Sequence, residues 1–348
     1  MKQPCRIGIV GAGRNTIEKH IPGLLAQPGV KIAGVCNRTP ASGAAVAQRF
    51  GIPRVYEIWT EAVADPDTDA IVIGSWPDLH ARVTLAALAQ DKHVLTEARM
   101  AATAGEARRM LDAARAKPHL VTQVVPAPFS FGVDATIRRL LAEDGLGELL
   151  AVEHHAPSAG FPDPTAPRHW RQDRDRSGFN IQALGIVYEM LMRWVGEAES
   201  VLAAGRVFDR VRRDERGAWS VVQVPDHLDV LASLACGAQL HLQQSAVMPR
   251  LVGGGTYLFG RRGALRFWNG ALYETTPAQS DWRPVVIPPE EAGRWRVEEE
   301  FISAIRGREP VRLTTFEDGV KYMEFTEAVQ RSLATGRRVA LPLALNDD

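Results

Sequence analysis

The sequence has few cysteines, no net charge and no long apolar segment. Its three cysteines, Cys5, Cys36 and Cys236, are far apart and odd in number, which fits neither a disulfide framework nor a closely spaced metal knuckle. Lys plus Arg number 41, as do Asp plus Glu, so the charge of a nucleic-acid-binding protein is missing. No apolar run approaches the roughly 18 to 20 residues that a membrane span needs. These absences predict a soluble, cytoplasmic protein that binds small molecules, not nucleic acids or membranes.

A chain of 348 residues is longer than one hydrophobic core usually supports, so we expect two domains. In residues 1–125, short apolar segments alternate with helix-like ones, and Thr39-Pro40 and Thr103 with Glu106 mark helix starts. This alternation predicts an N-terminal α/β domain with a doubly wound parallel sheet, the Rossmann fold. Its expected strands are 7–10, 32–36, 70–74, 93–96 and 120–125.

Residues 126–348 follow a different pattern. After a helix near 133–143, strand-like segments are joined by tight turns such as Cys236-Gly237, and two amphipathic helices close the chain. The pattern predicts an α+β domain with an open, mainly antiparallel sheet, whose part would be to present the substrate. Its expected strands are 149–155, 201–208, 228–235, 238–247, 256–259 and 264–268.

Two glycines follow the first expected strand. A turn of this kind lets the backbone approach a pyrophosphate closely, and the amides of the following helix then face the phosphates. The third position of the dinucleotide fingerprint is Thr16 instead of Gly or Ala, so the motif alone also fits a plain tight turn. Its place at the first strand of a βαβ unit favours dinucleotide binding. The residues expected to bind are Gly11, Gly13, Arg14, Asn15 and Thr16.

The end of the second strand lacks the Asp or Glu that usually binds the ribose hydroxyls of NAD. It reads Asn37-Arg38-Thr39. Arg38 can pair with a 2′-phosphate, and Asn37 and Thr39 can donate hydrogen bonds to it. We therefore expect a nicotinamide cofactor, with NADP preferred to NAD. The alternative is that Arg38 is a solvated side chain beside a helix N-cap.

Three further motifs accompany the glycine turn: Ser75-Trp76-Pro77-Asp-Leu-His80, Lys92-His-Val-Leu-Thr-Glu97 and Gly145-Leu-Gly147. With them, nearly the whole chain resembles the glucose-fructose oxidoreductase, inositol dehydrogenase and rhizopine-catabolism (Gfo/Idh/MocA) family. The resemblance implies that Glu97 lies near the nicotinamide and that the second domain forms a homo-oligomer, a dimer or tetramer, through its open sheet. It also implies that the cofactor is bordered by Ser75, Trp76, Pro77 and His80.

Two departures remove the proton-transfer residues that the family usually carries. Where the family reads Glu-Lys-Pro, this chain reads Glu97-Ala98-Arg99, and its usual Asp-x-Gly-x-His aligns with Ala183-Leu-Gly-Ile-Val187. Oxidising an alcohol needs a group that accepts the hydroxyl proton, typically contributing about 10² to 10⁴ in rate. Alanine and valine cannot do this, so either other side chains replace them or the scaffold performs different chemistry.

Several side chains are candidates for the missing catalytic role. Arg99 can stabilise a substrate oxygen but is a poor base, and it could equally be a surface residue at a helix start. His155 and His169 are the preferred proton carriers, because histidine titrates near neutrality. His154 is adjacent to His155 on an expected strand, so the two point to opposite faces and cannot both serve one site. Tyr188 is a weaker candidate for a proton donor.

Polar residues of the second domain are candidates for substrate binding. Arg168, Trp170 and Arg171 suit polyols or carboxylates, and family members often carry a Trp-Arg pair in a loop beside the substrate. Asn180 is expected on the helix face that the family turns toward the substrate, whereas Glu189 and Arg193 form an i, i+4 pair expected at the surface. No metal site is expected, because the histidines here show no known ligand spacing.

The sequence leaves three functions open. The first is a dehydrogenase or reductase that acts on a sugar, a cyclitol or a related hydroxy or carbonyl compound. The second is a redox-neutral lyase, epimerase or hydrolase that retains the cofactor, and the third is a non-catalytic cofactor-binding protein. The missing Lys, Asp and His weaken the first, while Glu97 and the polar segment 168–172 argue against the third. An NAD(P)-dependent oxidoreductase is the function we expect.

Overall fold

The computed structural model describes residues 4–158, 160–249, 254–279 and 281–344. The chain divides into two compact units, one formed by 1–126 with 296–323 and the other by 127–295 with 324–348. The sequence pattern predicts one domain over all of 126–348. Helix α9 (Val297–Ile305) instead belongs with the first unit, because its Glu298 bonds His20 and its Glu300 bonds Gln123.

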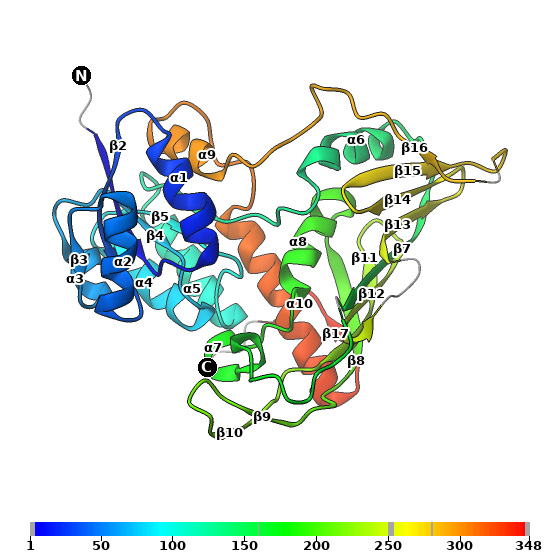
Figure 1. The fold of residues 1–348 in the computed structure, drawn as a ribbon. Helices are drawn as coiled ribbons and strands as arrows, with labels where there is room; N and C mark the ends of the chain where they lie inside the picture. The colour runs from blue at the N-terminus through cyan, green and yellow to red at the C-terminus, as the bar shows by residue number, and fades with distance from the viewer. Residues whose placement is uncertain (1–3, 159, 250–253, 280, 345–348) are drawn as a thin grey trace. The chain divides into compact units, whose positions relative to one another are not determined.

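The first unit contains a six-stranded parallel sheet, which confirms the predicted Rossmann architecture (Figure 1). Every residue of its strand β4 is buried, as expected for a strand covered on both faces. In sheet order the strands are β3 (Val55–Tyr56), β2 (Val30–Cys36), β1 (Cys5–Val10), β4 (Ala70–Ile73), β5 (His93–Thr96) and β6 (Thr122–Val124). The five predicted strands are all present, and only the two-residue β3 was not expected.

Two helices of the first unit, α2 and α5, begin where their capping residues predict. The Thr39 hydroxyl accepts the Ser42 N–H (3.2 Å) at the start of α2, and that of Thr103 accepts the Glu106 N–H (3.1 Å) at the start of α5. Gly51 ends α2 at a φ of 65°. Besides α9, the helices are α1 (Ile21–Leu25), α2 (Pro40–Phe50), α3 (Trp59–Ala64), α4 (Pro77–Ala89) and α5 (Ala104–Arg115), and η1 (Thr16–His20) is a π-helical segment directly before α1.

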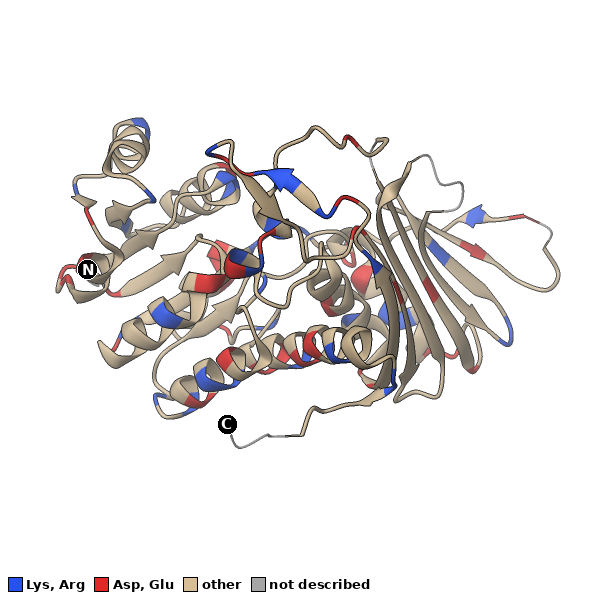
Figure 2. Cartoon of the chain, turned by 90° about the horizontal axis from the view of Figure 1, so that it is seen from below, with Lys and Arg blue, Asp and Glu red and all other residues tan. Residues whose placement is uncertain are grey.

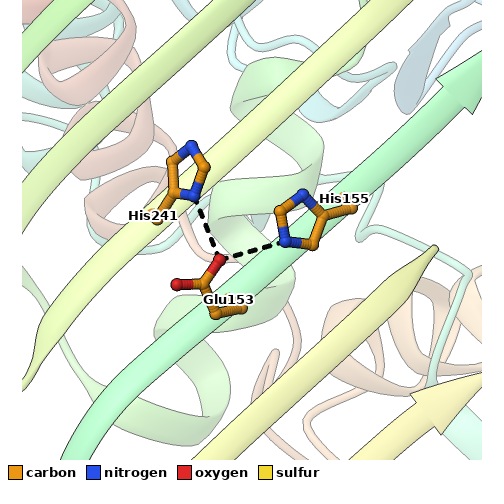
Figure 3. A group of neighbouring side chains, drawn as sticks. All are labelled: Glu153, His155 and His241. Carbon is orange, nitrogen blue, oxygen red and sulfur yellow. Dashed lines mark hydrogen bonds and ion pairs between the residues drawn. The ribbon is translucent and has the colours of Figure 1, made fainter. Parts of the chain in front are cut away.

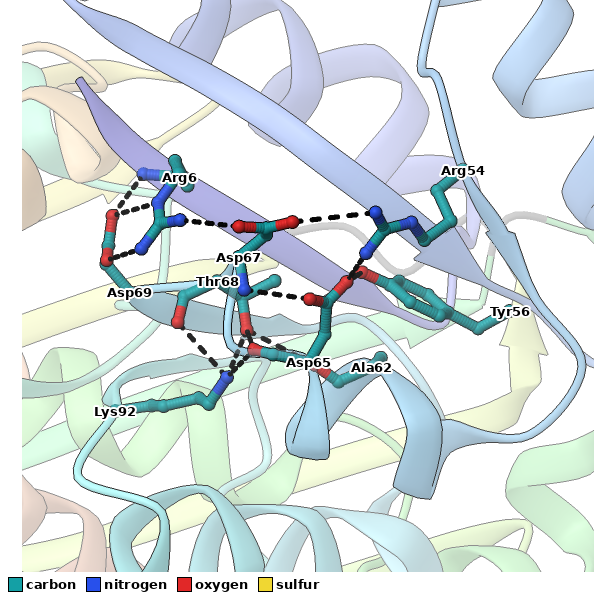
Figure 4. Close-up of polar contacts among 9 residues, drawn as sticks. All are labelled: Arg6, Arg54, Tyr56, Ala62, Asp65, Asp67, Thr68, Asp69 and Lys92. Carbon is teal, nitrogen blue, oxygen red and sulfur yellow. Dashed lines mark hydrogen bonds and ion pairs between the residues drawn. The ribbon is translucent and has the colours of Figure 1, made fainter.

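A polar network joins the amino-terminal ends of β1, β4 and β5 (Figure 4). Arg6 of β1 binds Asp69, which directly precedes β4, with 2.8 Å between Nη2 and Oδ1. Lys92, which directly precedes β5, is buried and donates to the carbonyl oxygens of Asp65 and Thr68. Burial lowers the pKa of Lys92. Lys92 therefore stabilises the sheet at the edge opposite the carboxyl ends of the strands.

The second unit contains a nine-stranded sheet, which is antiparallel except for the pair β7–β12 and so confirms the predicted mainly antiparallel architecture. The hairpin of β9 (Val211–Arg213) and β10 (Trp219–Val221) lies outside this sheet and was not expected. In sheet order the nine strands are β16 (Arg283–Pro284), β15 (Ala271–Thr275), β14 (Ala264–Trp268), β13 (Gly255–Gly260), β7 (Leu149–Ser158), β12 (Gln239–Pro249), β11 (His227–Leu234), β8 (Ala198–Arg206) and β17 (Val339–Ala340).

Helices pack on one face of this sheet. Figure 2 shows them beside the sheet, and α8 (Leu184–Val195) and α10 (Phe316–Thr335) contact each other through Tyr188 and Phe325. Residues alternate along β12, where Leu240 and Leu242 are buried and His241 is partly exposed. We call the face that carries His241 the open face. The unit also contains α6 (Phe131–Ala142), α7 (Arg174–Ser177) and the 3₁₀ helix η2 (Trp170–Gln172).

Across the described parts of the chain, no helix combines the length and the apolar character needed to cross a bilayer.

Candidate active site at the carboxyl edge of the parallel sheet

The expected cofactor-binding residues share one edge of the six-stranded sheet. They follow the carboxyl ends of strands that the topology makes neighbours, and the strand order reverses between β1 and β4. Open α/β sheets bind ligands at such a switch point. The residues are Gly11, Gly13, Arg14, Asn15 and Thr16 after β1, Asn37, Arg38 and Thr39 after β2, Ser75, Trp76, Pro77 and His80 after β4, and Glu97 after β5.

The glycine turn fits a pyrophosphate. Gly11 has a φ of 85°, and a Cβ there would lie 2.5 Å from the Ser75 nitrogen, so the loops after β1 and β4 pack closely only because residue 11 is glycine. The Ile17 N–H donates to the Gly13 carbonyl oxygen (3.0 Å), so the amides of the preceding turn lack intrahelical partners. These amides and the positive end of the helix suit phosphate oxygens.

Thr16, the departure from the glycine fingerprint, is accommodated by a second glycine. The Thr16 hydroxyl is buried and donates to the Gly11 carbonyl oxygen (3.3 Å). A Cβ on Gly74 would lie only 2.0 Å from that hydroxyl oxygen. Because Gly74 has no side chain, there is room for Thr16 at a position where the fingerprint usually has a smaller residue.

The three residues after β2 have different surroundings. The Asn37 amide oxygen accepts the N–H groups of Ala12 (3.3 Å) and Arg38 (3.0 Å), which fixes the glycine turn to β2. The Thr39 hydroxyl caps α2. The guanidinium carbon of Arg38 lies 5.7 Å from the ring centroid of Trp76, so a planar cation and an aromatic ring stand together at this edge.

Glu97 is held by a buried histidine. Its Oε1 accepts hydrogen bonds from Asn15 Nδ2 and from His20 Nε2 (2.9 Å), and its Oε2 accepts the Ala98 N–H (3.1 Å). The other ring nitrogen of His20, Nδ1, lies 2.6 Å from Glu298 Oε1. His20 and Glu298 are buried, whereas the Glu97 side chain is 16% exposed, so the imidazole is shielded from water and only the Glu97 end of this chain is accessible.

These contacts fix the charge states at neutral pH. Burial acts to lower the pKa of His20, but the hydrogen bonds to Glu298 and Glu97 outweigh it and raise the pKa to about 9. Burial acts to raise the pKa of Glu97, but the His20 hydrogen bond and charge outweigh it and hold that pKa below its usual value. An imidazolium therefore bridges two carboxylates, and sequence reasoning missed both His20 and Glu298.

His80 joins two of the predicted loops. It is fully buried, with Nδ1 2.9 Å from the Arg99 carbonyl oxygen and Nε2 3.0 Å from the Ser75 carbonyl oxygen. It therefore holds the turn after β4 to the segment after β5. Arg99 itself is 1% exposed, so the alternative of a surface arginine is wrong.

His155 and His154 point to opposite faces of the second sheet, as the strand alternation predicts. His154 is buried and its Nδ1 bonds the Thr256 hydroxyl (2.9 Å). His155 lies on the open face, and the side chains of Glu153 and His241 are its neighbours there (Figure 3). Neither of these neighbours was a predicted site residue.

The segment 168–171 is compact. Arg168 forms an ion pair with Asp173 (2.8 Å), and the guanidinium carbon of Arg171 lies 4.3 Å from a ring centroid of Trp170. His169 Nδ1 accepts the Arg171 N–H (3.2 Å), which leaves Nε2 as the protonated nitrogen of the neutral ring. Desolvation and the charge of Arg171 lower the pKa of His169.

Two expectations for the region around α8 are wrong. Asn180 precedes the helix, which begins at Leu184, and its amide donates to the Ser177 carbonyl oxygen (2.6 Å) in a buried turn. Glu189 is 2% exposed and accepts the Ala127 N–H (2.9 Å), so it is not a surface residue. Helical spacing from Arg193 identified the pair but could not reveal that another segment covers it.

Tyr188 packs in the interior of the second unit. Its hydroxyl accepts the Ala198 N–H (2.8 Å), and its ring stacks on Phe325 with 3.6 Å between centroids. Burial raises the pKa of Tyr188. These contacts are those of a packing residue.

Known protein families match most of the length of this chain. Residues 5–124 match the family model described as "Oxidoreductase family, NAD-binding Rossmann fold", and residues 135–266 match the "GFO/IDH/MocA C-terminal domain". The sequence is 28% identical to a dTDP-3,4-didehydro-2,6-dideoxy-alpha-D-glucose 3-reductase of Streptomyces antibioticus, over 93% of this chain and 95% of the reductase.

A 1,5-anhydro-D-fructose reductase of Ensifer adhaerens is 36% identical over 51% of each chain. The matched part ranges from 32% to 95% of a relative's length. A solved levoglucosan dehydrogenase in complex with NADH has the same fold, with a TM-score of 0.80, 22% identity and coverage of 98% of this chain and 100% of that one. This chain therefore belongs to the Gfo/Idh/MocA family of oxidoreductases with an NAD-binding Rossmann fold.

Proposed function

We propose that the protein transfers a hydride between a nicotinamide cofactor, NADP in preference to NAD, and a sugar or closely related hydroxy or carbonyl compound. The observation that carries the proposal is the fixed carboxylate of Glu97 at the end of β5, beside the glycine turn at the switch point. Two relatives are named as reductases of sugar derivatives. The relatives named above are oxidoreductases, which favours this function over a redox-neutral enzyme or a non-catalytic protein.

Different residues at the sheet edge bind different parts of the cofactor. The amides after Gly11 and Gly13 take the pyrophosphate, and the loop after β4, from Ser75 to Pro77, borders the nicotinamide half together with Glu97. When bound, the cofactor supplies the acceptor or donor of the hydride. Arg38 follows β2, and the ring of Trp76, from the loop after β4, lies beside it. A guanidinium at this position favours the 2′-phosphate of NADP.

The proton must move through residues other than Ala98 and Val187. His169 is the preferred carrier, because its Nδ1 accepts a backbone amide and its Nε2 can exchange a proton. His155 is the second choice, since Glu153 already engages its Nε2 on the open face. Arg99, a permanent cation at the end of β5, stabilises a substrate oxygen, and the proposed substrate contacts are Arg168, Trp170 and Arg171.

The test is turnover of a panel of aldoses, anhydro-sugars and polyols with each cofactor, followed by nicotinamide absorbance. The proposal expects a rate with at least one sugar, and a His169→Ala variant with cofactor affinity unchanged and kcat lowered by about 10² or more. An unchanged kcat in that variant would move the proton role to another side chain. A cofactor-binding protein without turnover on any sugar would contradict the proposal itself.

A homo-oligomer, a dimer or tetramer, and a cytoplasmic location belong to the same proposal. Leu231 and Phe259 are exposed apolar residues on the open face, where they pair across the ladder with His241 and Ala151. A second copy of the chain would cover them. Light scattering coupled to size exclusion tests the assembly, and a monomer at all concentrations would contradict it.

A further inference from the structure

Two histidines and a glutamate converge on the open face of the second sheet (Figure 3). His155 Nε2 and His241 Nδ1 each lie 3.0 Å from the same oxygen, Oε2 of Glu153. The three potential ligand atoms all lie within 4.8 Å of one another. In the single chain the three side chains are partly exposed.

The sheet itself sets this arrangement. Glu153 and His155 are two residues apart on β7, so both point to one face, and His241 stands directly opposite Glu153 on the parallel neighbour β12. Both strands lie inside the sheet, with β13 beyond β7 and β11 beyond β12. Ladder hydrogen bonds on both sides of each strand hold the backbones, so the three side chains are placed before any ion binds.

Two of the three distances between ligand atoms are close to those of tetrahedral coordination. Zinc bonds of about 2.0–2.1 Å to nitrogen and oxygen at tetrahedral angles separate two ligands by roughly 3.3 Å. The two nitrogen-to-oxygen distances of 3.0 Å differ from this by a few tenths of an ångström. Small side-chain rotations would therefore admit an ion, with solvent at the fourth position.

Asp229 on β11 also supports a metal site, because it contacts the ring nitrogen of His241 that does not face Glu153. Its Oδ1 lies 3.1 Å from His241 Nε2 and also accepts Gln243 Nε2 (3.1 Å). When a carboxylate accepts the N–H of one ring nitrogen, the lone pair of the other ring nitrogen is left for a metal ion. Metal-binding histidines usually make such a second contact.

We propose that Glu153, His155 and His241 bind one divalent first-row transition-metal ion of the zinc class, with Asp229 orienting His241. Two imidazoles and one carboxylate suit such an ion, whereas Mg²⁺ and Ca²⁺ prefer all-oxygen sites. The ion links β7 to β12 through Glu153 and His241, which are 88 residues apart in the sequence. None of the three ligands is a proposed cofactor-binding residue, and only His155 is also a candidate, the second choice, for the proton carrier of the proposed reaction.

The experiment titrates untagged, chelator-treated full-length protein with Co²⁺ and with Zn²⁺. We expect one Co²⁺ per chain with the visible absorption of a tetrahedral site, displaced by Zn²⁺, and a melting temperature that rises with added Zn²⁺. Asp229→Asn should weaken binding by about 10- to 100-fold, the usual cost of losing such a supporting contact. His241→Ala, His155→Ala and the near-isosteric Glu153→Gln should weaken it by more than that.

His119→Ala is the matched control, because His119 is an exposed histidine of the other unit that pairs with Asp91. It should bind as the parent does. Circular dichroism must show each variant folded, and Glu153→Gln keeps the test decisive if a histidine variant is not. Absence of a tetrahedral Co²⁺ spectrum in the parent, or equal affinity in Glu153→Gln and the parent, would overturn the proposal.

Discussion

The Nε2 of His20 lies 2.9 Å from the Oε1 of Glu97, so the helical segment η1 is fixed to the carboxyl end of β5 by a partly buried ion pair. Asn15, in the turn proposed to bind the pyrophosphate, bonds the same carboxylate. This turn and Glu97 are thus positioned by one hydrogen-bonded cluster. Any change to His20 should affect the stability of the protein and the cofactor site together.

The first prediction follows from the raised pKa of His20. A group whose folded-state pKa of about 9 exceeds its unfolded value of about 6.5 stabilises the fold fully below pH 6.5, and this stabilisation is lost as the pH rises through 9. His20→Gln should remove this loss, which amounts to about 3 kcal/mol at most. Denaturant unfolding of both proteins between pH 6 and 10 measures it, and parallel curves would refute the ion pair.

The second prediction concerns the loss of folding stability at low pH and follows from the lowered pKa of Glu97. Its folded-state pKa is lowered, so the stabilisation that it contributes is present above its unfolded value and is lost as the pH falls through its folded value. Glu97→Gln should therefore flatten the loss of stability in acid. Unfolding curves from pH 6 down to 3 test this, with Glu106→Gln, a carboxylate in the first turn of α5, as the control.

A third prediction concerns the glycine turn. Gly13→Val should abolish cofactor binding and leave the fold intact, because a side chain there blocks the approach of the backbone to the pyrophosphate. Gly132→Val is the matched control, since a Cβ at Gly132 meets nothing within 4 Å. Calorimetry with NADPH and NADH gives the affinities, and normal binding by folded Gly13→Val would place the cofactor elsewhere.

A fourth prediction concerns cofactor choice. Arg38→Ala should weaken NADPH binding by about 10- to 100-fold, since a charge-assisted hydrogen bond contributes roughly 1.5–3 kcal/mol. Its NADH affinity should stay close to that of the parent. Arg49→Ala, at the far end of α2, is the control. Fluorescence titrations showing that the parent binds NADH as tightly as NADPH would contradict the preference.

The sequence predicted the parallel sheet because its buried strands and capped helices carry local signals. The buried charges around the site carry none. His20 and Glu298 are 278 residues apart, and the buried Glu189 accepts the backbone N–H of Ala127, 62 residues before it. The metal-site candidate likewise joins two strands whose pairing no spacing along the chain reveals.

Hydride transfer tests the central claim most directly. Purified protein, confirmed to bind nicotinamide cofactor, is assayed by nicotinamide absorbance against sugars and polyols with NADP⁺ and NAD⁺, and in the reverse direction against keto-sugars with NADPH and NADH. We predict turnover of at least one sugar, a higher kcat/KM with the phosphorylated cofactor, and no turnover by Gly13→Val. A parent protein that binds the cofactor but changes its absorbance with no sugar in either direction would contradict the account.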